Sequence, residues 1–419
     1  MGMTLAEKIL SFKANKASLF PNEIIEVDVD HTMTYDLFGP SVVKIFFDMG
    51  FKNVWDPSRI AVIYDHLVPP KNHSEVANFT FMNNFAKMQG INKVHESDGI
   101  CHQIMFECGY ARPGDIILGT DSHTCTLGAV GAFATGIGYT EMASVWGTGK
   151  IWLKVPSSLK FEINGSFNAG VYSKDLILKI IGDIGTAGAT YKAIEFSGSL
   201  IDNLSVSQRL TLCNMAVEAG AKVALMSPDE KVAEHYKLIG YCEILKLKPD
   251  PDASYEKIYR YDASSLVPMI SYSPSVENVM PLTDIEGEEI QKAFLGSCTN
   301  GRLEDLQVAS SILKNRKIND RVQFIITPAS RKVYLEAIQK GIMATLAEAG
   351  AIITHPACGL CSGINGGLVA DNDTLISSNN RNFLGRMGGL NARVILASPA
   401  SVAASAIEGK VTDPRKYLK

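Results

Sequence analysis

Three cysteines stand in runs and at a spacing that suit metal chemistry. Cys358 and Cys361 form a Cys-x-x-Cys pair, and Cys298 lies 60 residues before Cys358 in the run Gly-Ser-Cys-Thr-Asn-Gly. A closed structural metal site normally has four protein ligands, so three thiolates leave one coordination position for another ligand. The cysteines therefore predict a metal centre that is open to a substrate.

A single zinc ion is the alternative to an iron–sulfur centre. His355, in the run His-Pro-Ala-Cys, has a plausible local spacing for a fourth zinc ligand. From spacing alone, the two centres are about equally favoured. Disulfides are disfavoured, because the chain is long and has no export signal. We expect the other five cysteines to be small buried residues: Cys101, Cys108, Cys125, Cys213 and Cys242.

Short apolar runs lead into most of the residues that could do chemistry. Residues 293–295 predict a buried strand that ends in the turn containing Cys298. Helical stretches such as 75–89 and 330–349 lie between such runs, and this alternation predicts an α/β fold with mainly parallel sheets. In such sheets ligands gather at the carboxyl ends of the strands. Further strands are expected at 59–64, 115–118, 322–326 and 393–396.

Histidines beside carboxylates are the candidate acids and bases. The runs Asp65-His66 and Asp121-Ser122-His123 each follow a predicted strand, and His102 lies between them in the chain. A neighbouring carboxylate raises the pKa of an imidazole and fixes its tautomer. The second run is not a hydrolase triad, because three consecutive side chains do not converge as nucleophile, base and orienting group.

Composition narrows the function classes. The chain has 419 residues, a net charge of −4 and 20% charged residues, which predict two or three domains and no nucleic-acid partner. No apolar run reaches the ~20 residues that a membrane span needs. The N-terminus lacks the apolar stretch of a signal peptide, so we expect a cytoplasmic protein.

Two boundaries divide the chain. The segment 249–281 contains five prolines without clear periodicity, which predicts an extended connection between domains. A second boundary is expected near 155–158. The predicted domains are 1–156, 157–270 and 271–419.

Together with the cysteine runs, several longer motifs resemble those of the aconitase family, the [4Fe–4S] hydro-lyases. The resemblance covers most of the chain and implies three α/β/α domains of the aconitase iron–sulfur type around one central [4Fe–4S] cluster. Cys298, Cys358 and Cys361 would hold that cluster. The motifs are Asp65-His66, His102-Gln103, Gly119 to Thr124, Cys213 to Met215 with Glu218, and Asn380 to Phe383 with Gly385-Arg386.

The resemblance also implies roles for the other residues. Asp65 and His66 would form an acid pair near the departing hydroxyl group, His102 would pair with Asp121, and His123 would pair with Glu218. Glu218 lies four residues after Asn214, which places both on one face of a helix. Arginine suits a carboxylate substrate because its planar group makes two parallel hydrogen bonds. The implied substrate-binding residues are Ser122, Asn214, Arg381 and Arg386.

The chain is most similar to the large subunit of a two-subunit hydro-lyase. Its substrate would be a small branched hydroxy-dicarboxylate, with 3-isopropylmalate dehydratase of leucine biosynthesis as the leading interpretation. Homoaconitase and the dehydratases of 2,3-dimethylmalate or 2-methylmalate are alternatives within the family. Tyr35 departs from the isopropylmalate branch, which commonly has histidine there. A zinc-stabilised binding protein without catalysis is the alternative from another class.

A small partner subunit is expected. Single-chain aconitases carry a further mobile domain that supplies a serine base and additional arginines, and this sequence ends at Lys419 with no stretch for it. A separate subunit with this swivel domain would complete the enzyme.

Overall fold

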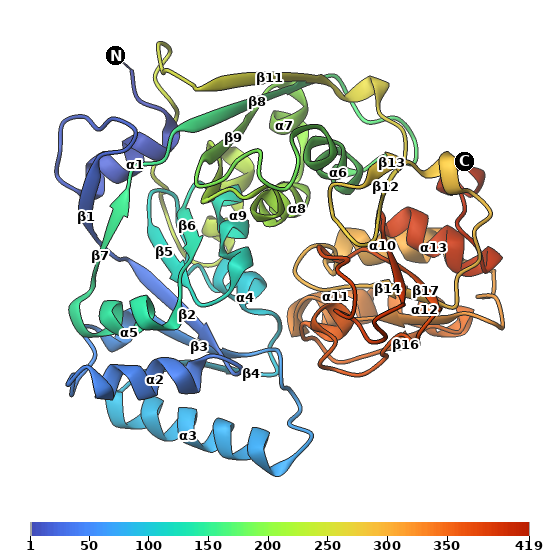
Figure 1. Ribbon diagram of the computed structural model, residues 1–419, viewed down its shortest axis with the longest axis horizontal. Helices are drawn as coiled ribbons and strands as arrows, with labels where there is room; N and C mark the ends of the chain where they lie inside the picture. Colours follow the sequence, from blue (N-terminus) through green and yellow to red (C-terminus); the bar gives the residue numbers. More distant parts are fainter. Residues whose placement is uncertain (1, 419) are drawn as a thin grey trace. The chain divides into compact units, whose positions relative to one another are not determined.

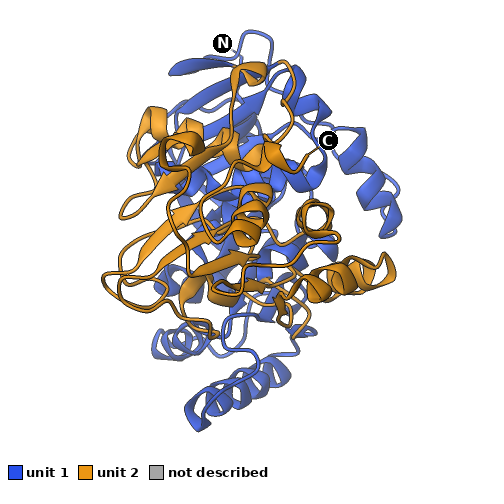
Figure 2. Cartoon of the chain, turned by 90° about the vertical axis from the view of Figure 1, so that its right-hand side faces the viewer, with its two compact units in different colours: residues 1–96, 101–164, 189–261 blue, residues 97–100, 165–188, 262–419 orange. Residues whose placement is uncertain are grey.

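The computed structural model describes residues 2–418, and these form two compact units (Figure 2). Of the described residues, the first unit comprises 2–96, 101–164 and 189–261. The second comprises 97–100, 165–188 and 262–418.

The first unit contains a five-stranded sheet in the order β4-β3-β2-β5-β6, and all its paired strands are parallel. The helices α2 (Gly39–Asp48), α3 (His73–Gln89) and α5 (Tyr139–Thr148) contribute apolar side chains to its core. Because the strands are parallel, their carboxyl ends all lie at one edge. The strands are β2 (His31–Tyr35), β3 (Ile60–Tyr64), β4 (Lys93–Glu96), β5 (Ile116–Gly119) and β6 (Phe133–Gly136).

A second sheet of the same unit has the order β10-β9-β8-β11. Ala193, Val223 and Leu225 from this sheet belong to the same apolar core as the first sheet, which is why both fall in one compact unit. The strands are β8 (Ser158–Asn164), β9 (Ala193–Ser197), β10 (Val223–Met226) and β11 (Lys257–Asp262), and a separate antiparallel pair joins β1 (Ile24–Asp28) to β7 (Lys150–Lys154).

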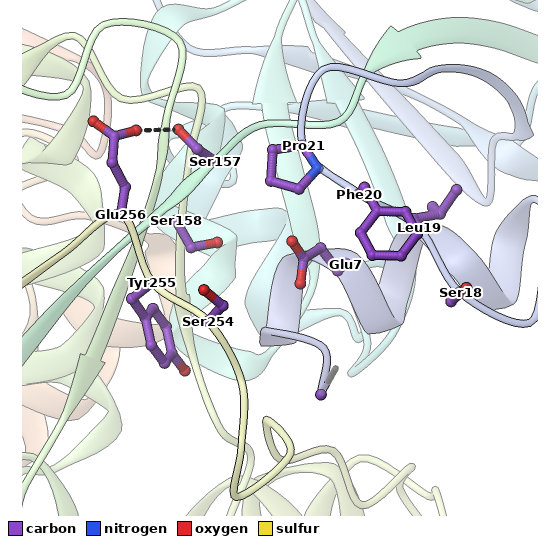
Figure 3. A pocket seen from close by; sticks show the side chains of 11 residues that line it. Glu7, Ser18, Leu19, Phe20, Pro21, Ser157, Ser158, Ser254, Tyr255 and Glu256 are labelled. Atoms are coloured by element: carbon purple, nitrogen blue, oxygen red, sulfur yellow. Dashed lines mark hydrogen bonds between the residues drawn. The ribbon is translucent and has the colours of Figure 1, made fainter.

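Buried polar contacts attach the N-terminal helix α1 (Leu5–Lys13) to this second sheet. Thr4 and Glu7 form a capping box, and the Leu5 N–H donates to Glu195 Oε2 on β9 at 3.0 Å. Tyr255 donates to the other carboxylate oxygen of Glu195 at 2.6 Å. Glu7 and Tyr255 line a cavity of 210 Å³ (Figure 3), but both are already hydrogen-bonded within the protein.

The second unit is built on a seven-stranded sheet in the order β13-β12-β18-β17-β14-β15-β16. Strands β14 to β18 are parallel, and β12 and β13 add an antiparallel edge. Helices α10 (Leu303–Leu313), α12 (Ile342–Ala349) and α13 (Pro399–Glu408) fill its core (Figure 1). The strands are β12 (Met269–Tyr272), β13 (Val279–Pro281), β14 (Lys292–Leu295), β15 (Gln323–Ile326), β16 (Ile352–Ile353), β17 (Thr374–Ser377) and β18 (Arg393–Leu396).

The predicted α/β class with mainly parallel sheets is confirmed. Two local expectations need correction. The proline-containing segment 249–281 is more than a connection, because β11, β12 and β13 lie within it and pair into sheets. The expected helix over 330–349 is two helices, α11 (Arg331–Gln339) and α12, because Gly341 takes a positive φ of 70°.

The division into three domains remains a prediction. Helix α6 (Ser173–Ile184), which the prediction assigns to the middle domain, packs with the C-terminal unit. Among residues 2–418, no helix combines the length and apolar character that crossing a membrane requires.

Candidate active site

Asp65 and His66 follow strand β3 and are tightly held at the carboxyl edge of the first sheet. His66 Nδ1 lies 2.6 Å from Asp65 Oδ1, and the second Asp65 oxygen accepts the Cys101 N–H at 2.7 Å. Asp65 is fully buried, and His66 is 6% exposed. The carboxylate therefore fixes the ring through Nδ1 and leaves Nε2 as the atom for proton transfer.

The charge state of His66 is set by the surrounding carboxylates. Burial of the ring lowers its pKa, but Asp65, Asp121 and Asp36 outweigh burial and raise the pKa to about 9. His66 is therefore an imidazolium at neutral pH. A cationic ring with one fixed nitrogen is suited to donate a proton from the other.

Asp36 is a site residue that the sequence analysis did not select. It follows strand β2, is fully buried, and its carboxylate accepts the backbone N–H groups of His66 and Leu67. Burial, followed by the charge of Asp65, raises the pKa of Asp36 to about 6. Its position directly after a strand, like that of Asp65, was the only signal, and it was weak because β2 contains His31 and two threonines and is not an apolar run like β3.

Two further histidines form a chain of hydrogen bonds with carboxylates. His102 Nε2 lies 2.9 Å from Asp121 Oδ1, and His123 Nε2 lies 2.8 Å from Glu218 Oε1. Asp121 also lies 3.5 Å from His123 Nδ1, so this carboxylate serves both rings. Burial would raise the pKa of Asp121, but the two imidazoles outweigh burial and hold it well below its ordinary value. The two predicted pairings are present in the geometry.

The 3₁₀ helix η2 (Ser122–Val130) positions Ser122 and His123 after strand β5. The Ser122 hydroxyl lies 3.3 Å from His123 Nδ1. Helix α8 (Val206–Met215) ends before Glu218, which lies on the following 3₁₀ turn. Asn214 donates to Thr126 of η2 at 2.8 Å, and Glu218 contacts His123 of η2. The expectation that both lie on one helix is wrong, because α8 ends at Met215.

The cysteines lie at the carboxyl edge of the sheet in the second unit. Cys298 follows β14. Cys358 directly precedes a 3₁₀ turn over Gly359–Ser362, and Cys361 lies within that turn. The side chain of Asn380, after β17, connects two of them. Its amide donates to Cys298 Sγ at 3.4 Å, and its carbonyl oxygen accepts from Cys361 Sγ at 3.5 Å. All three cysteines are at most 5% exposed and none forms a disulfide.

The backbone beside these cysteines has a positive φ in two places, and at Ser297 this conformation is strained. Ser297, buried directly before Cys298, has a φ of 66°, which L residues with side chains rarely adopt. Gly359, next to Cys358, has the same φ, and a Cβ there would lie 2.7 Å from Thr327 Oγ1. Only glycine fits this position. Strain of this kind is maintained by surrounding structure and is concentrated at functional sites.

Arginines surround the same loops. Arg302 is 2% exposed and donates to the Cys298 and Thr299 carbonyl oxygens at 2.6 and 2.8 Å. Arg386 Nη2 lies 3.9 Å from Cys361 Sγ. Arg381 is half-buried and directly follows Asn380. Of the two predicted arginines, Arg386 thus contacts a cysteine sulfur, while Arg302 was not predicted.

The spread of the three sulfurs bears on the choice between zinc and a cluster. Tetrahedral zinc with thiolate bonds near 2.3 Å holds sulfurs about 3.8 Å apart. Among residues 2–418, only Asp36, Asp65 and His66 bring three potential ligand atoms within 4.8 Å of one another. The three cysteine sulfurs, with or without His355, do not meet this criterion. All three thiols are buried, and two of them contact the Asn380 side chain. A cluster of several iron ions accepts more widely separated thiolates than a single ion does.

The remaining cysteines mostly follow the prediction. Cys101, Cys125 and Cys213 are buried, and Cys108 is partly buried. Cys242 is exposed, so the expectation that it would be buried is wrong. Its surroundings explain this, because it follows the exposed C-terminal end of helix α9 (Glu230–Leu238).

Comparison with known proteins places these observations in context. A family model described as aconitase family (aconitate hydratase) matches residues 7–288 and 282–409. A 3-isopropylmalate dehydratase large subunit 1 of Methanopyrus kandleri is 47% identical over all of both chains. A 3-isopropylmalate dehydratase large subunit 1 of Thermotoga maritima is 45% identical, also over all of both chains.

Two further matches widen the comparison. A probable methanogen homoaconitase large subunit of Methanothermobacter thermautotrophicus is 44% identical over 99% of this chain and 98% of its own length. The crystal structure of Thermococcus kodakaraensis aconitase X in its holo-form aligns with a TM-score of 0.52 at 11% identity. It covers 90% of this chain and 89% of that chain, and confirms the aconitase-type fold.

Proposed function

Because the chain belongs to the aconitase family, whose hydro-lyases generally use an iron–sulfur cluster, we propose that it is the large subunit of a [4Fe–4S] hydro-lyase. The substrate would be a small branched hydroxy-dicarboxylate. The observation that carries this proposal is His66, a buried imidazolium fixed by Asp65 at a sheet edge. Elimination of water requires a proton for the departing hydroxyl group, and this residue is built to supply one.

Cys298, Cys358 and Cys361 are the proposed ligands of one [4Fe–4S] cluster. Such a cluster, held by three thiolates, would supply Lewis-acid polarisation of the substrate hydroxyl group when bound. Asn380 supports the cysteine arrangement, because it contacts two of the sulfurs.

The other proposed residues orient the substrate and the acid. Arg381 and Arg386 would bind substrate carboxylates through paired hydrogen bonds. Ser122 and Asn214 would bind its polar groups. Ser122 lies beside His123, and Asn214 is bound to Thr126 of the same 3₁₀ helix. Asp121 and Glu218 hold the rings of His102 and His123 in fixed orientations. Fixed rings keep the reacting groups aligned during proton transfer.

A partner subunit is part of the proposal. The carbon-bound proton beside a carboxylate needs a strong base, and the three imidazoles are already engaged with carboxylates. The relatives are named large subunits, which implies small subunits in those enzymes. We infer a small subunit here that carries the swivel domain and supplies the base. No nucleic acid or membrane enters the proposal, and a cytoplasmic location stays a prediction.

Among substrates, 3-isopropylmalate is the leading choice. Relatives with that name and relatives named homoaconitase have nearly equal identity to this chain, so homoaconitate is the second candidate. Tyr35, the departure from the isopropylmalate branch, lies against the His66 ring with centroids 4.3 Å apart. It therefore supports the proposed acid by packing.

The test is activity of the full chain with its cluster, alone and with a candidate small subunit. Anaerobically reconstituted chain should contain about four irons and four sulfides and show no dehydratase activity by itself. Addition of the small subunit should produce activity on 3-isopropylmalate that exceeds activity on homocitrate and 2,3-dimethylmalate. Zinc in place of iron would overturn the proposal, and full activity of the isolated chain would overturn its two-subunit part.

A further inference from the structure

Lys174 is a fully buried lysine whose surroundings contain no carboxylate bound to it. It lies near the start of helix α6, and its side chain is 0% exposed. Its ammonium donates to the backbone carbonyl oxygens of Ser378, at 2.9 Å, and of Asn379. Within residues 2–418, no ion pair joins this ammonium to a carboxylate. A buried ammonium with only neutral acceptors is costly unless negative charge lies near it.

The carboxylates near Lys174 are poor counter-charges. Asp175 uses its oxygens to accept the N–H groups of Tyr172 and Met269, at 2.8 Å each. Asp305 accepts from the Asn300 amide and from the Arg302 N–H. Burial raises the pKa of Asp175 to about 7 and that of Asp305 to about 6, so burial weakens Asp175 most as a counter-charge at neutral pH.

The cysteine sulfurs are a further source of negative charge near Lys174, and Cys361 is the largest single one. Burial lowers the pKa of Lys174 to about 7. Four groups act in the opposite direction, and in order of size they are Cys361, Asp175, Cys298 and Asp305. These are the two cysteines that Asn380 connects, and Asn380 directly follows the carbonyl group of Asn379 that Lys174 binds. The ammonium thus acts on the cysteines both through charge and through the loop.

We propose that Lys174 is a positioning residue of the cysteine site. Its ammonium supplies the positive charge that stabilises the thiolates of Cys298 and Cys361 when they hold a cluster, and it fixes the 378–379 backbone so that Asn380 reaches both sulfurs. This inference rests on the proposed function, because it assumes that these cysteines bind an iron–sulfur cluster. The residue would act through the cluster ligands and would not contact the substrate.

Two substitutions separate the charge from the hydrogen bonds. Lys174→Gln removes the charge and keeps an N–H donor, whereas Lys174→Met removes both. Lys179→Met is the matched control, since Lys179 lies on the same helix but is 39% exposed in its side chain and pairs with Asp183. The measurements are iron and sulfide content after anaerobic reconstitution of the full chain, and the midpoint potential of the cluster.

A positive charge close to a cluster favours the reduced state, so its removal should lower the potential. Lys174→Gln should keep its iron and sulfide and show at least a tenfold shift in the reduction equilibrium, which is about 59 mV for one electron. Lys174→Met should show this shift and also a lower iron content, while Lys179→Met should match the wild type in both. If Lys174→Met fails to fold, Lys174→Gln alone decides.

A Lys174→Gln potential equal to that of Lys179→Met would overturn the inference. If the wild-type chain itself takes up no iron–sulfur cluster, the proposed function fails instead. The two failures are therefore distinguishable in one experiment.

Discussion

The pair formed by Asp65 and His66 allows a prediction whose size follows from the structure. Asp65→Asn removes the carboxylate that lies 2.6 Å from His66 Nδ1 and is the largest influence raising the pKa of that ring. Burial of the ring persists in the variant, so the pKa should fall from about 9 toward or below the ordinary 6.5. At pH 8, about 90% of His66 is protonated with the first value and about 3% with the second. The acid form therefore decreases about 30-fold.

The substitution should also cost stability. In the wild type, the two Asp65 oxygens accept from the His66 ring and from the Cys101 N–H. The single carbonyl oxygen of asparagine can replace only one of them. A buried group left without its partner costs about 1–3 kcal/mol, which urea unfolding of the full chain would measure.

Nuclear magnetic resonance of ring-labelled histidine measures the His66 pKa without the partner subunit or the substrate. Asp48→Asn, which neutralises an exposed aspartate of helix α2, is the matched control and should leave the pKa near 9. In the two-subunit enzyme, the alkaline limb of activity should move to lower pH by the same amount. A His66 pKa that remains near 9 in Asp65→Asn would refute the reasoning, since another group would then hold the proton.

Three further outcomes are expected. His66→Ala should reduce turnover by about two to four orders of magnitude, the usual scale for a positioned acid, with iron content unchanged by chemical analysis; normal turnover would make His66 structural. Cys361→Ser should lose the iron and sulfide, whereas Cys242→Ser, at an exposed cysteine, should keep both, and an intact cluster in the first variant would contradict the ligand assignment. The raised folded-state pKa of His66 should stabilise the fold fully below pH 6.5, and this stabilisation should be lost as pH rises through about 9. Urea unfolding at several pH values should show this loss in the wild type and not in Asp65→Asn.

Much of the framework follows from local pattern. The apolar runs at 59–64 and 293–295 become β3 and β14, and the residues after them take the edge positions expected of a parallel sheet. Strand formation and the turn that follows depend on neighbouring residues, so they can be read along the chain. The pairings of His102 with Asp121 and of His123 with Glu218 needed the family resemblance, because 95 residues separate the members of the second pair.

Other features depended on residues far apart in the sequence. Asp36 had no local sign that its carboxylate would accept the backbone N–H groups of His66 and Leu67, some 30 positions later. The break at Gly341 was missed for a different reason, because a glycine inside a periodic apolar pattern can either continue a helix or end it.

Lys174 and Lys179 show most clearly that local sequence pattern does not predict the burial of a side chain. Both lie in the same amphipathic stretch of α6, and a lysine there is ordinarily solvated. Lys179 is exposed and pairs with Asp183, while Lys174 is enclosed and bonded to carbonyl groups 204 and 205 residues away. The local sequence pattern predicts that both lysines are exposed to solvent. Burial is a property of what packs around a side chain, and at Lys174 those neighbours come from the distant loop that follows β17.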